Sequence, residues 1–243
     1  MSITTYNNGR LGNQIIRNLA TSLIAEKYDL YVTYSNYEVI QSLGIILFSG
    51  QNKYDDTIVL TDDNYFDVLG SNNVTTNINP NNNYFQTREI MNFLYRHIHS
   101  DDVKNHIIHK NPVNNRYNNN NDAFVHVRLT DVAQHNPGIQ YYLNVLKDIQ
   151  FDTLYISSDN IQHHIIRDIV KTYPHNTKII YMDEISTIQF ASTCKHVVLS
   201  HGSFSAVIGY VSFFSDVHYP EYEPGKIWYG DMFSIEGWMK HNT

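Results

Sequence analysis

The sequence has little cysteine, no surplus of positive charge and no long hydrophobic run, and each shortage excludes a class of protein. The single cysteine, Cys194, cannot form an intrachain disulfide, so we expect it to pack in the core of a protein from a reducing compartment. The net charge of −7 argues against nucleic acid as a main partner. Without a basic leader or a membrane-length apolar run, the sequence predicts a cytoplasmic protein with no signal peptide or membrane anchor.

Hydrophobic residues make up 42% of the 243 residues, which is enough for one large core or two smaller ones. The segment 111–122 is rich in asparagine and is typical of a linker. We therefore predict an N-terminal domain over residues 1–117 and a C-terminal domain over residues 118–243. Strands alternate with helices, most regularly in the second half, which predicts an α/β protein with mostly parallel sheets and Rossmann-like domains.

The hydrophobic periodicity predicts the individual elements. The expected strands are 3–6, 30–34, 58–60, 124–127, 153–156, 178–182, 196–199 and 217–219. The expected helices are 14–28, 38–43, 88–97, 101–109, 139–148, 161–173, 186–192 and 205–213, and residues 72–83 are expected to form a loop.

The first strand runs into a turn that contains Gly9 and Gly12, and a helix follows at once, with Asn13 as its expected cap. Glycine lets the backbone approach a ligand closely, and a helix N-terminus offers unpaired N–H groups to an anion. The spacing matches neither the P-loop nor the dinucleotide fingerprint. A tight turn without a ligand is the alternative.

The strand 124–127 is followed by Arg128 and Asp131. Open α/β sheets bind ligands at the carboxyl ends of their strands, so these two side chains are expected where a ligand can reach them. The guanidinium group suits a phosphate. The alternative is that Arg128 and Asp131 only pair with each other.

Two later strand exits are also polar. Asp159 follows one strand, and its carboxylate could accept paired N–H donors from a guanine edge. Gly202, Ser203 and Ser205 follow another, at a helix N-terminus that could hold phosphate oxygens. Serine and aspartate also serve in caps and turns, which is the alternative for each exit taken alone. Together with Arg128 they predict a nucleotide pocket.

The same residues resemble a known family. Residues 9–14 resemble the N-terminal signature of the glycosyltransferase family 11 α-1,2-fucosyltransferases, and residues 126–131 are similar to the His-x-Arg-x-x-Asp motif of the wider fucosyltransferase superfamily. Residues 157–159 resemble the acidic strand exit of these enzymes, and residues 200–205 their late Ser-Phe-Ser segment. The four matches follow the order of the family and span nearly the whole chain.

The resemblance implies a GT-B fold, an inverting transfer of fucose from GDP-fucose to a glycan hydroxyl, and no metal or other cofactor. It implies that Arg128 binds the diphosphate and that His126 and Asp159 contact guanosine. Ser203, Phe204 and Ser205 would hold ribose and phosphate, while Gly12, Asn13 and Gln14 would line the cleft near fucose. An inverting displacement also needs a base. Asp131 and His201 are the candidates, and orientation of Arg128 is the alternative role for Asp131.

The chain departs from the family at Leu129, where many relatives carry a second arginine, and at Ala206 and Val207, which replace paired aromatic residues. These departures leave two alternatives open: the same fold with another nucleotide deoxysugar, and a nucleotide- or glycan-binding protein without catalysis. The tail carries Trp228, Tyr229 and Trp238, which are expected to pack across the domain junction, with stacking on a sugar as the alternative. The sequence does not indicate an oligomeric state.

Overall fold

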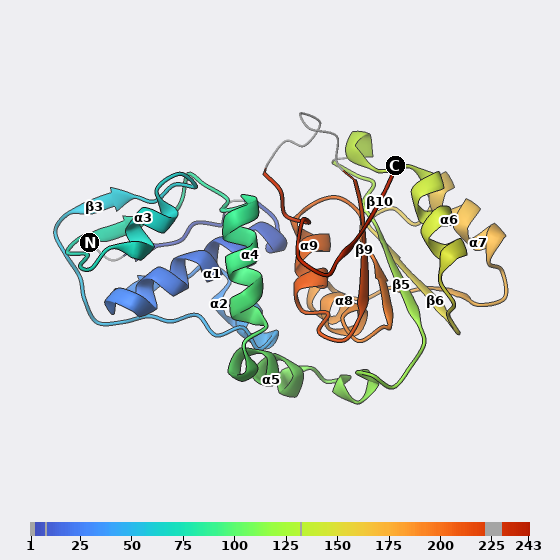
Figure 1. Ribbon diagram of the computed structural model, residues 1–243, viewed down its shortest axis with the longest axis horizontal. Helices are drawn as coiled ribbons and strands as arrows, with labels where there is room; N and C mark the ends of the chain where they lie inside the picture. The colour runs from blue at the N-terminus through green and yellow to red at the C-terminus, as the bar shows by residue number, and fades with distance from the viewer. Residues whose placement is uncertain (1–2, 8, 132, 222–229) are drawn as a thin grey trace.

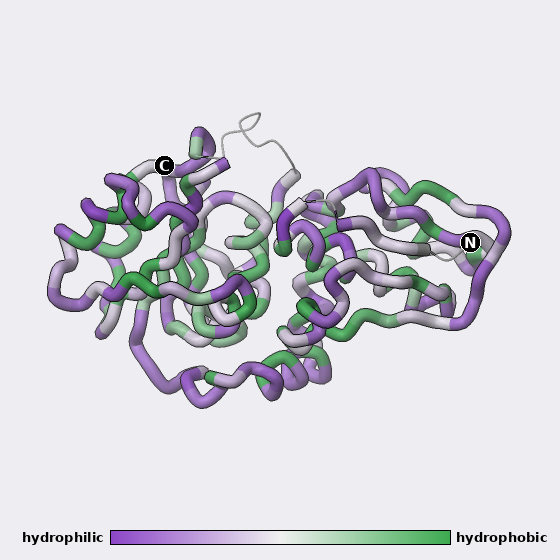
Figure 2. The backbone as a smooth tube through the Cα atoms, turned by 180° about the vertical axis from the view of Figure 1, so that it is seen from behind, coloured by the Kyte–Doolittle hydropathy of each residue, from purple (hydrophilic) through white to green (hydrophobic). Residues whose placement is uncertain are grey.

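The protein is described by a computed structural model that covers residues 3–7, 9–131, 133–221 and 230–243 (Figure 1). Two α/β halves lie side by side, and the segment 111–122 connects them along one edge of the molecule. This connection is largely hydrophilic (Figure 2). None of the helices in the described ranges combines the length and the hydropathy of a membrane-spanning segment. The Trp228 and Tyr229 predictions lie outside the described residues.

The N-terminal half contains two pairs of short parallel strands. β1 (Ile3–Thr4) pairs with β2 (Val32–Thr33), and β3 (Thr57–Val59) pairs with β4 (Asn77–Asn79). Asn81 joins the two pairs, because its side chain accepts from the Tyr6 N–H at 2.8 Å and donates to the Thr4 carbonyl at 3.1 Å. The helices of this half are α1 (Leu11–Tyr28), α2 (Tyr37–Ser42), α3 (Tyr65–Gly70), α4 (Arg88–Ile98) and α5 (Asp101–Lys110).

The C-terminal half is built on a six-stranded parallel sheet with the order β10-β9-β8-β5-β6-β7. Its strands are β5 (Ala123–Val127), β6 (Leu154–Ser158), β7 (Thr177–Ile179), β8 (His196–Val198), β9 (Asp216–Pro220) and β10 (Met239–His241). Its helices are α6 (Ile139–Asp148), α7 (His164–Thr172), α8 (Glu184–Ala191) and α9 (Ser203–Tyr210), with 3₁₀ turns η1 (Asn114–Arg116) and η2 (Ala133–His135). The predicted parallel α/β architecture is confirmed.

β5 is one of the two central strands, and all five of its residues are buried. Phe124 belongs to the apolar cluster shared with α9, while Val125 and Val127 pack with residues of α6 and α7. Helices therefore cover both faces of the sheet, as buried parallel strands require. His126 lies on the α9 face of this strand, where its ring contacts Phe204 at a centroid distance of 5.2 Å.

The larger apolar cluster crosses from one half to the other. It includes Leu11 and Ile15 of α1, Leu94 of α4 and Val207 of α9. Trp238 packs against Tyr95 of α4 at a centroid distance of 6.0 Å and stacks on Tyr210 of α9, so its predicted packing across the junction is confirmed. Cys194 is buried in the same cluster, as expected. The boundary near residue 117 stays a prediction, because the core is continuous across it.

Several predicted elements are wrong in their limits. α1 begins at Leu11, so Asn13 lies inside the first turn and Arg10 occupies the N-cap position. The expected loop 72–83 contains β4, which reads Asn-Ile-Asn and offers a single apolar residue to a periodicity search. α3 and β10 were not expected, since the first has only six residues and the second carries a lysine and a histidine.

Candidate active site

A cleft of about 400 Å³ lies between the two halves, at the carboxyl ends of the strands. The parallel order brings the exits of β5, β6 and β8 to one edge, which confirms the predicted grouping of Arg128, Asp159 and the 200–205 turn. The N-terminal half contributes five of the lining residues: Gly9, Arg10, Asn13, Tyr84 and Gln86. Residues from the β5, β6, β7 and β8 exits form the opposite wall, with Met232 from the C-terminal segment.

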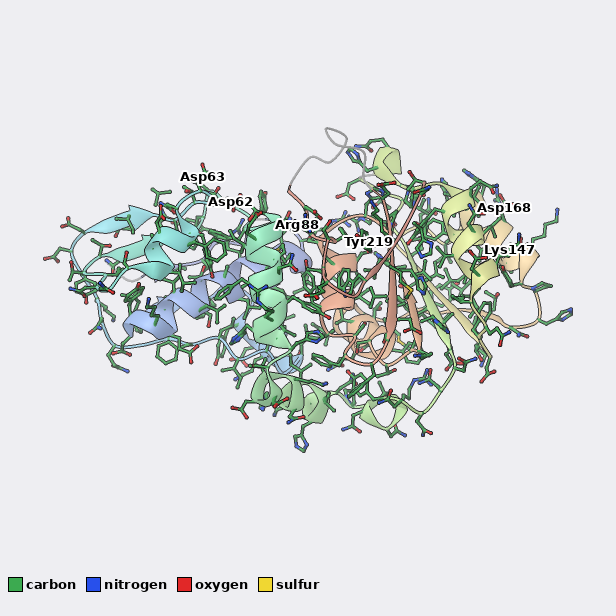
Figure 3. The ribbon with its side chains drawn as sticks, viewed as in Figure 1. Asp62, Asp63, Arg88, Lys147, Asp168 and Tyr219 are labelled. Atoms are coloured by element: carbon green, nitrogen blue, oxygen red, sulfur yellow. The ribbon has the colours of Figure 1, made fainter. Side chains whose placement is uncertain are left out.

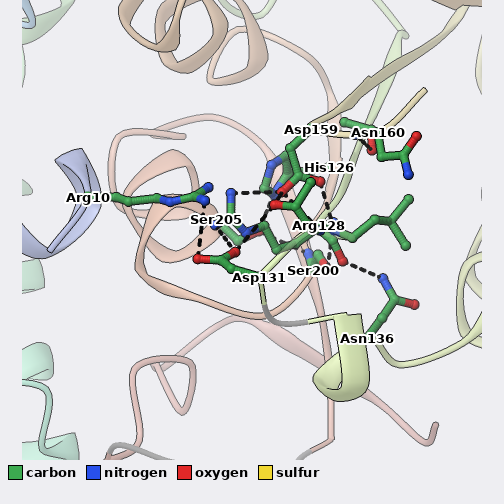
Figure 4. Close-up of polar contacts among 12 residues, drawn as sticks. Arg10, His126, Arg128, Asp131, Asn136, Asp159, Asn160, Ser200 and Ser205 are labelled. Carbon is green, nitrogen blue, oxygen red and sulfur yellow. Dashed lines mark hydrogen bonds and ion pairs between the residues drawn. The ribbon is translucent and has the colours of Figure 1, made fainter. Parts of the chain in front are cut away.

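Arg128 is held by two carboxylates at the exit of β5 (Figure 4). One guanidinium nitrogen donates to Asp131, and another lies 2.9 Å from Asp159. The backbone is fixed as well, because the Arg128 N–H donates to Ser200 Oγ at 3.2 Å and Asn136 donates to its carbonyl at 3.0 Å. The predicted Arg128–Asp131 pair therefore forms, within a larger network and on the wall of a cleft.

Arg10 joins this network from the N-terminal half. Its guanidinium lies 3.2 Å from Asp131, so one carboxylate bridges two arginines that stand on opposite sides of the cleft (Figure 4). About half of each partner's side-chain surface remains exposed. Exposed ion pairs contribute little to stability, so an incoming anion can compete with Asp131 for Arg10 at small cost.

Asp159 is more fully engaged by its own chain than the sequence suggested. Its carboxylate accepts from the Leu129 N–H at 2.7 Å, from the Thr130 hydroxyl at 2.6 Å and from the Thr130 N–H at 3.3 Å, in addition to its pair with Arg128. Burial raises the pKa of Asp159, but these donors and the Arg128 charge outweigh it and lower the pKa overall. Three of these donors meet Oδ2 and one meets Oδ1, so this carboxylate orders the loop after β5.

His126 is buried beneath the cleft and its Nδ1 lies 2.5 Å from Ser205 Oγ. The same hydroxyl accepts from the Ser200 N–H at 3.1 Å, so Ser205 is buried behind the wall and positions the imidazole. Burial lowers the pKa of His126 to about 4; the Asp159 charge opposes this shift and the Arg128 charge adds to it. The ring is therefore neutral at pH 7.

The N-terminus of α9 meets the N-terminus of α1 at Gly12. A Cβ at position 12 would lie 2.5 Å from the Phe204 nitrogen and 2.6 Å from the Ser203 carbonyl carbon. Gly12 is thus needed where two backbones touch, and it does not itself line the cleft. Ser203 and Phe204 do line it, and Gly202 precedes them with a φ of +94°, which favours glycine.

Gln14 and Asn13 have different positions relative to the cleft. Gln14 is buried, donates to the Gly9 carbonyl at 2.7 Å and accepts from Asn36, so it holds the turn that precedes α1. Asn13 lines the cleft and accepts from Gln86 Nε2 at 2.9 Å. Of the three residues expected near the sugar, only Asn13 faces the cavity within the described part of the chain.

Several cleft residues were not foreseen from the sequence. They are Arg10, Tyr84, Gln86, Met182, Glu184, Thr187 and Met232. The strand-exit rule could have found Met182 and Glu184, because they follow β7 in the same parallel sheet. His201, a candidate base, also lines the cleft, where burial and the charge of His135 lower its pKa to about 4. In the described ranges no three His, Cys, Asp or Glu side chains are placed to hold a metal ion.

Comparison with known proteins identifies the architecture. No family model matches the sequence, and no curated protein matches it. Among solved structures, E. coli heptosyltransferase WaaC with ADP superposes with a TM-score of 0.51 at 10% sequence identity, and the alignment covers 100% of this chain and 93% of that chain. The chain has a GT-B fold. In GT-B terms, the cleft described above lies between two facing Rossmann-like halves, as the resemblance implied.

Two buried histidines and one half-buried histidine predict a loss of stability in acid. His126, His201 and His218 have pKa values lowered to about 4, mainly by burial, whereas a histidine in the unfolded chain has a pKa near 6.5. Between these values the unfolded state binds more protons, so the free energy of unfolding should fall as the pH decreases from about 6.5 to about 4. His126 alone would account for about 3 kcal/mol.

Urea unfolding at pH 7.5, 6, 5 and 4.5 would measure this dependence. In the variant His126→Asn, the free energy of unfolding should fall less steeply with decreasing pH than in wild type, whatever the stability of the variant at pH 7.5. Parallel curves for the two proteins would contradict the assignment of the acid sensitivity to His126.

Proposed function

We propose that the protein is an inverting glycosyltransferase that moves a sugar, most specifically L-fucose, from a GDP-linked donor to a glycan hydroxyl. The observation that carries the proposal is the pair of arginines, Arg10 and Arg128, that face each other across a GT-B cleft next to the N-terminus of α9. Two cations and unpaired helix N–H groups suit a diphosphate. The presence of ADP in the WaaC structure supports a nucleoside diphosphate in this fold.

The fucosyl assignment rests on the four motif segments. Residues 9–14, 126–131, 157–159 and 200–205 are far apart in the sequence, yet each contributes residues to the same cleft. Ser203 and Phe204 would contact ribose and phosphate there, and His126 would support guanosine from beneath. Three of the predicted residues would act indirectly. Gly12 would let α1 approach α9, Gln14 would hold the turn before α1, and Ser205 would hold the His126 ring.

For the nucleobase, Glu184 is better placed than Asp159. Glu184 lines the cleft and is exposed, and it makes no ion pair with any residue in the described ranges. A carboxylate without an ion-pair partner can accept both N–H donors on the guanine edge, whereas Asp159 already accepts from Thr130, Leu129 and Arg128. Asp159 would then be a positioning residue for Arg128.

In the proposed reaction the acceptor oxygen bonds to the anomeric carbon as the bond from that carbon to the β-phosphate oxygen breaks. The electron pair leaves with the nucleoside diphosphate, and Arg128 and Arg10 stabilise its growing charge. The acceptor proton passes to Asp131, which is released when the diphosphate takes its two arginines. His201 also lines the cleft and is the second base candidate.

Thermal unfolding with GDP, UDP and ADP tests the nucleotide, and GDP release from GDP-fucose with galactose-terminated acceptors tests the reaction. We expect a shift with GDP and turnover with GDP-fucose. Turnover with a different nucleotide sugar would refute the donor assignment and favour another deoxysugar. Tight GDP binding without turnover over a broad acceptor panel would refute catalysis and favour a binding protein.

The variant Asp131→Asn separates the two roles of this carboxylate. The neutral amide no longer competes with GDP for Arg10 and Arg128, so the variant protein should bind GDP at least as tightly as wild type. Without a base its kcat should fall about 100-fold. Isothermal titration and steady-state kinetics measure the two quantities, and an unchanged kcat would exclude Asp131 as the base.

A further inference from the structure

Tyr84 is an aromatic residue on the N-terminal wall of the cleft, opposite Arg128 and His126. Its neighbours on that wall are the side-chain amides of Asn13 and Gln86, which hydrogen-bond to each other. The remaining side chain there is Arg10, which pairs with Asp131. An aromatic face beside two amides is a surface suited to an uncharged molecule with many hydroxyl groups.

Beneath Tyr84 lies a buried arginine that the proposed reaction does not use. Arg17 of α1 is only 1% exposed, and its Cζ lies 5.1 Å from the centre of the Tyr84 ring. Its Nε donates to the Asn83 carbonyl at 3.1 Å and its Nη1 to the Tyr6 carbonyl at 3.3 Å. Burying a guanidinium is costly unless its donors are used, so these contacts define a specific position for the side chain.

The contacts of Arg17 join two strand exits. Tyr6 follows β1 and Asn83 follows β4, and these strands belong to different two-stranded sheets. The segment around Tyr84 is also fixed at Phe85, whose N–H donates to the Asp62 carboxylate at 2.9 Å. Asp62 lies in the N-terminal half of the molecule (Figure 3). Phe85 has a φ of +56°, which is unusual for a bulky residue. The backbone on both sides of Tyr84 is therefore held in place.

We infer that Tyr84 is the platform on which the acceptor sugar stacks, and that Arg17 is a positioning residue that fixes this platform. The C–H face of a pyranose would lie on the Tyr84 ring, while Asn13 and Gln86 bind its hydroxyl groups. The inference rests on the proposed function and adds the acceptor subsite to it. Arg17 acts through Tyr84 and does not touch the sugar.

Binding of neutral methyl pyranosides to the GDP-saturated protein, followed by NMR, tests this assignment without requiring turnover. Tyr84→Ala should weaken binding of the sugar about tenfold, as expected for a lost aromatic contact, while Tyr84→Phe stays within about threefold of wild type. The dissociation constant for GDP should not change in either variant. An equal loss of GDP affinity in Tyr84→Ala would move Tyr84 to the donor site and overturn the inference.

Arg17→Met tests the positioning role. It should weaken sugar binding about as much as Tyr84→Ala does. The double variant should bind the sugar no more weakly than Tyr84→Ala alone, because both changes act through one contact. Additive losses would refute a role through Tyr84. If Arg17→Met does not fold, Arg17→Lys, which keeps the charge but lacks the planar fork, should give an intermediate loss.

Failure of the inference and failure of the proposed function give different results. A protein that binds none of GDP, UDP and ADP refutes the nucleotide site and this inference with it. If the wild-type protein binds GDP but none of the pyranosides, only the Tyr84 platform is refuted. The same holds if Tyr84→Ala binds the pyranosides as tightly as wild type does.

Discussion

Arg128→Ala is expected to abolish the stabilisation of the protein by GDP. A nucleotide at about a hundred times its dissociation constant adds about 2.7 kcal/mol, which for a chain of this size is a shift of roughly 5–10 °C in Tm. Arg128 is only 15% exposed and is held by ion pairs with Asp131 and Asp159, so its loss removes the fixed cation from the wall of the cleft. Loss of this cation should also lower kcat by about 10²–10³-fold, as for other preorganised groups that stabilise a leaving charge.

The fold should survive this change, because Asp159 keeps its donors from Leu129 and Thr130 and Asp131 keeps its pair with Arg10. The matched control is Arg167→Ala, which removes an exposed arginine of α7 that does not line the cleft and should leave the GDP shift intact. A full shift in Arg128→Ala would place the diphosphate elsewhere.

Gly12→Ala should destabilise the protein and weaken nucleotide binding together. The new Cβ would lie 2.5 Å from one backbone atom of α9 and 2.6 Å from another, and backbone cannot move aside as a flexible side chain can. Overpacking of this kind costs about 1–3 kcal/mol. The relief of the clash must move the first turn of α9, and with it Ser203 and Phe204 on the cleft wall.

Urea unfolding and GDP titration measure these two effects. Gly70→Ala is the control: apart from its chain neighbours and its own helix backbone, no atom of the described residues lies within 4 Å of its Cβ position, and alanine favours a helix by up to about 1 kcal/mol over glycine. The control should be neutral or slightly stabilising and should bind GDP normally. A Gly12→Ala protein with wild-type stability would show that the two helices are less tightly fixed than their contact suggests.

The sequence predicted those parts of the fold that carry a strong periodic signal. α6 has the expected limits, and β5 was found within one residue, because their apolar residues recur at helical or strand spacing. β4 and β10 were missed because their stability comes from parallel neighbours rather than from their own composition. Short polar strands of this kind are determined by tertiary structure.

For the site, the expectation that ligands bind at the carboxyl ends of parallel strands placed Arg128, Asp159 and Ser203 correctly at one edge of the sheet. The parallel order of the strands alone determines that grouping. This expectation could not assign their contacts. The donors to Asp159 include backbone N–H groups of the loop after β5, and the partner that bridges Asp131 to the other half is Arg10, 121 positions earlier in the chain. Such contacts depend on how the halves meet, which no local pattern encodes.

The contact at Gly12 brings the positive ends of two helix dipoles together. Each helix N-terminus carries about half a positive charge, and neither α1 nor α9 has an acidic residue in its first turn. The two halves therefore repel each other electrostatically at the point where their backbones touch, and apolar packing and the Asp131 bridge oppose this repulsion. A bound diphosphate would neutralise both helix ends at once, so the donor would strengthen the junction that forms its own binding site.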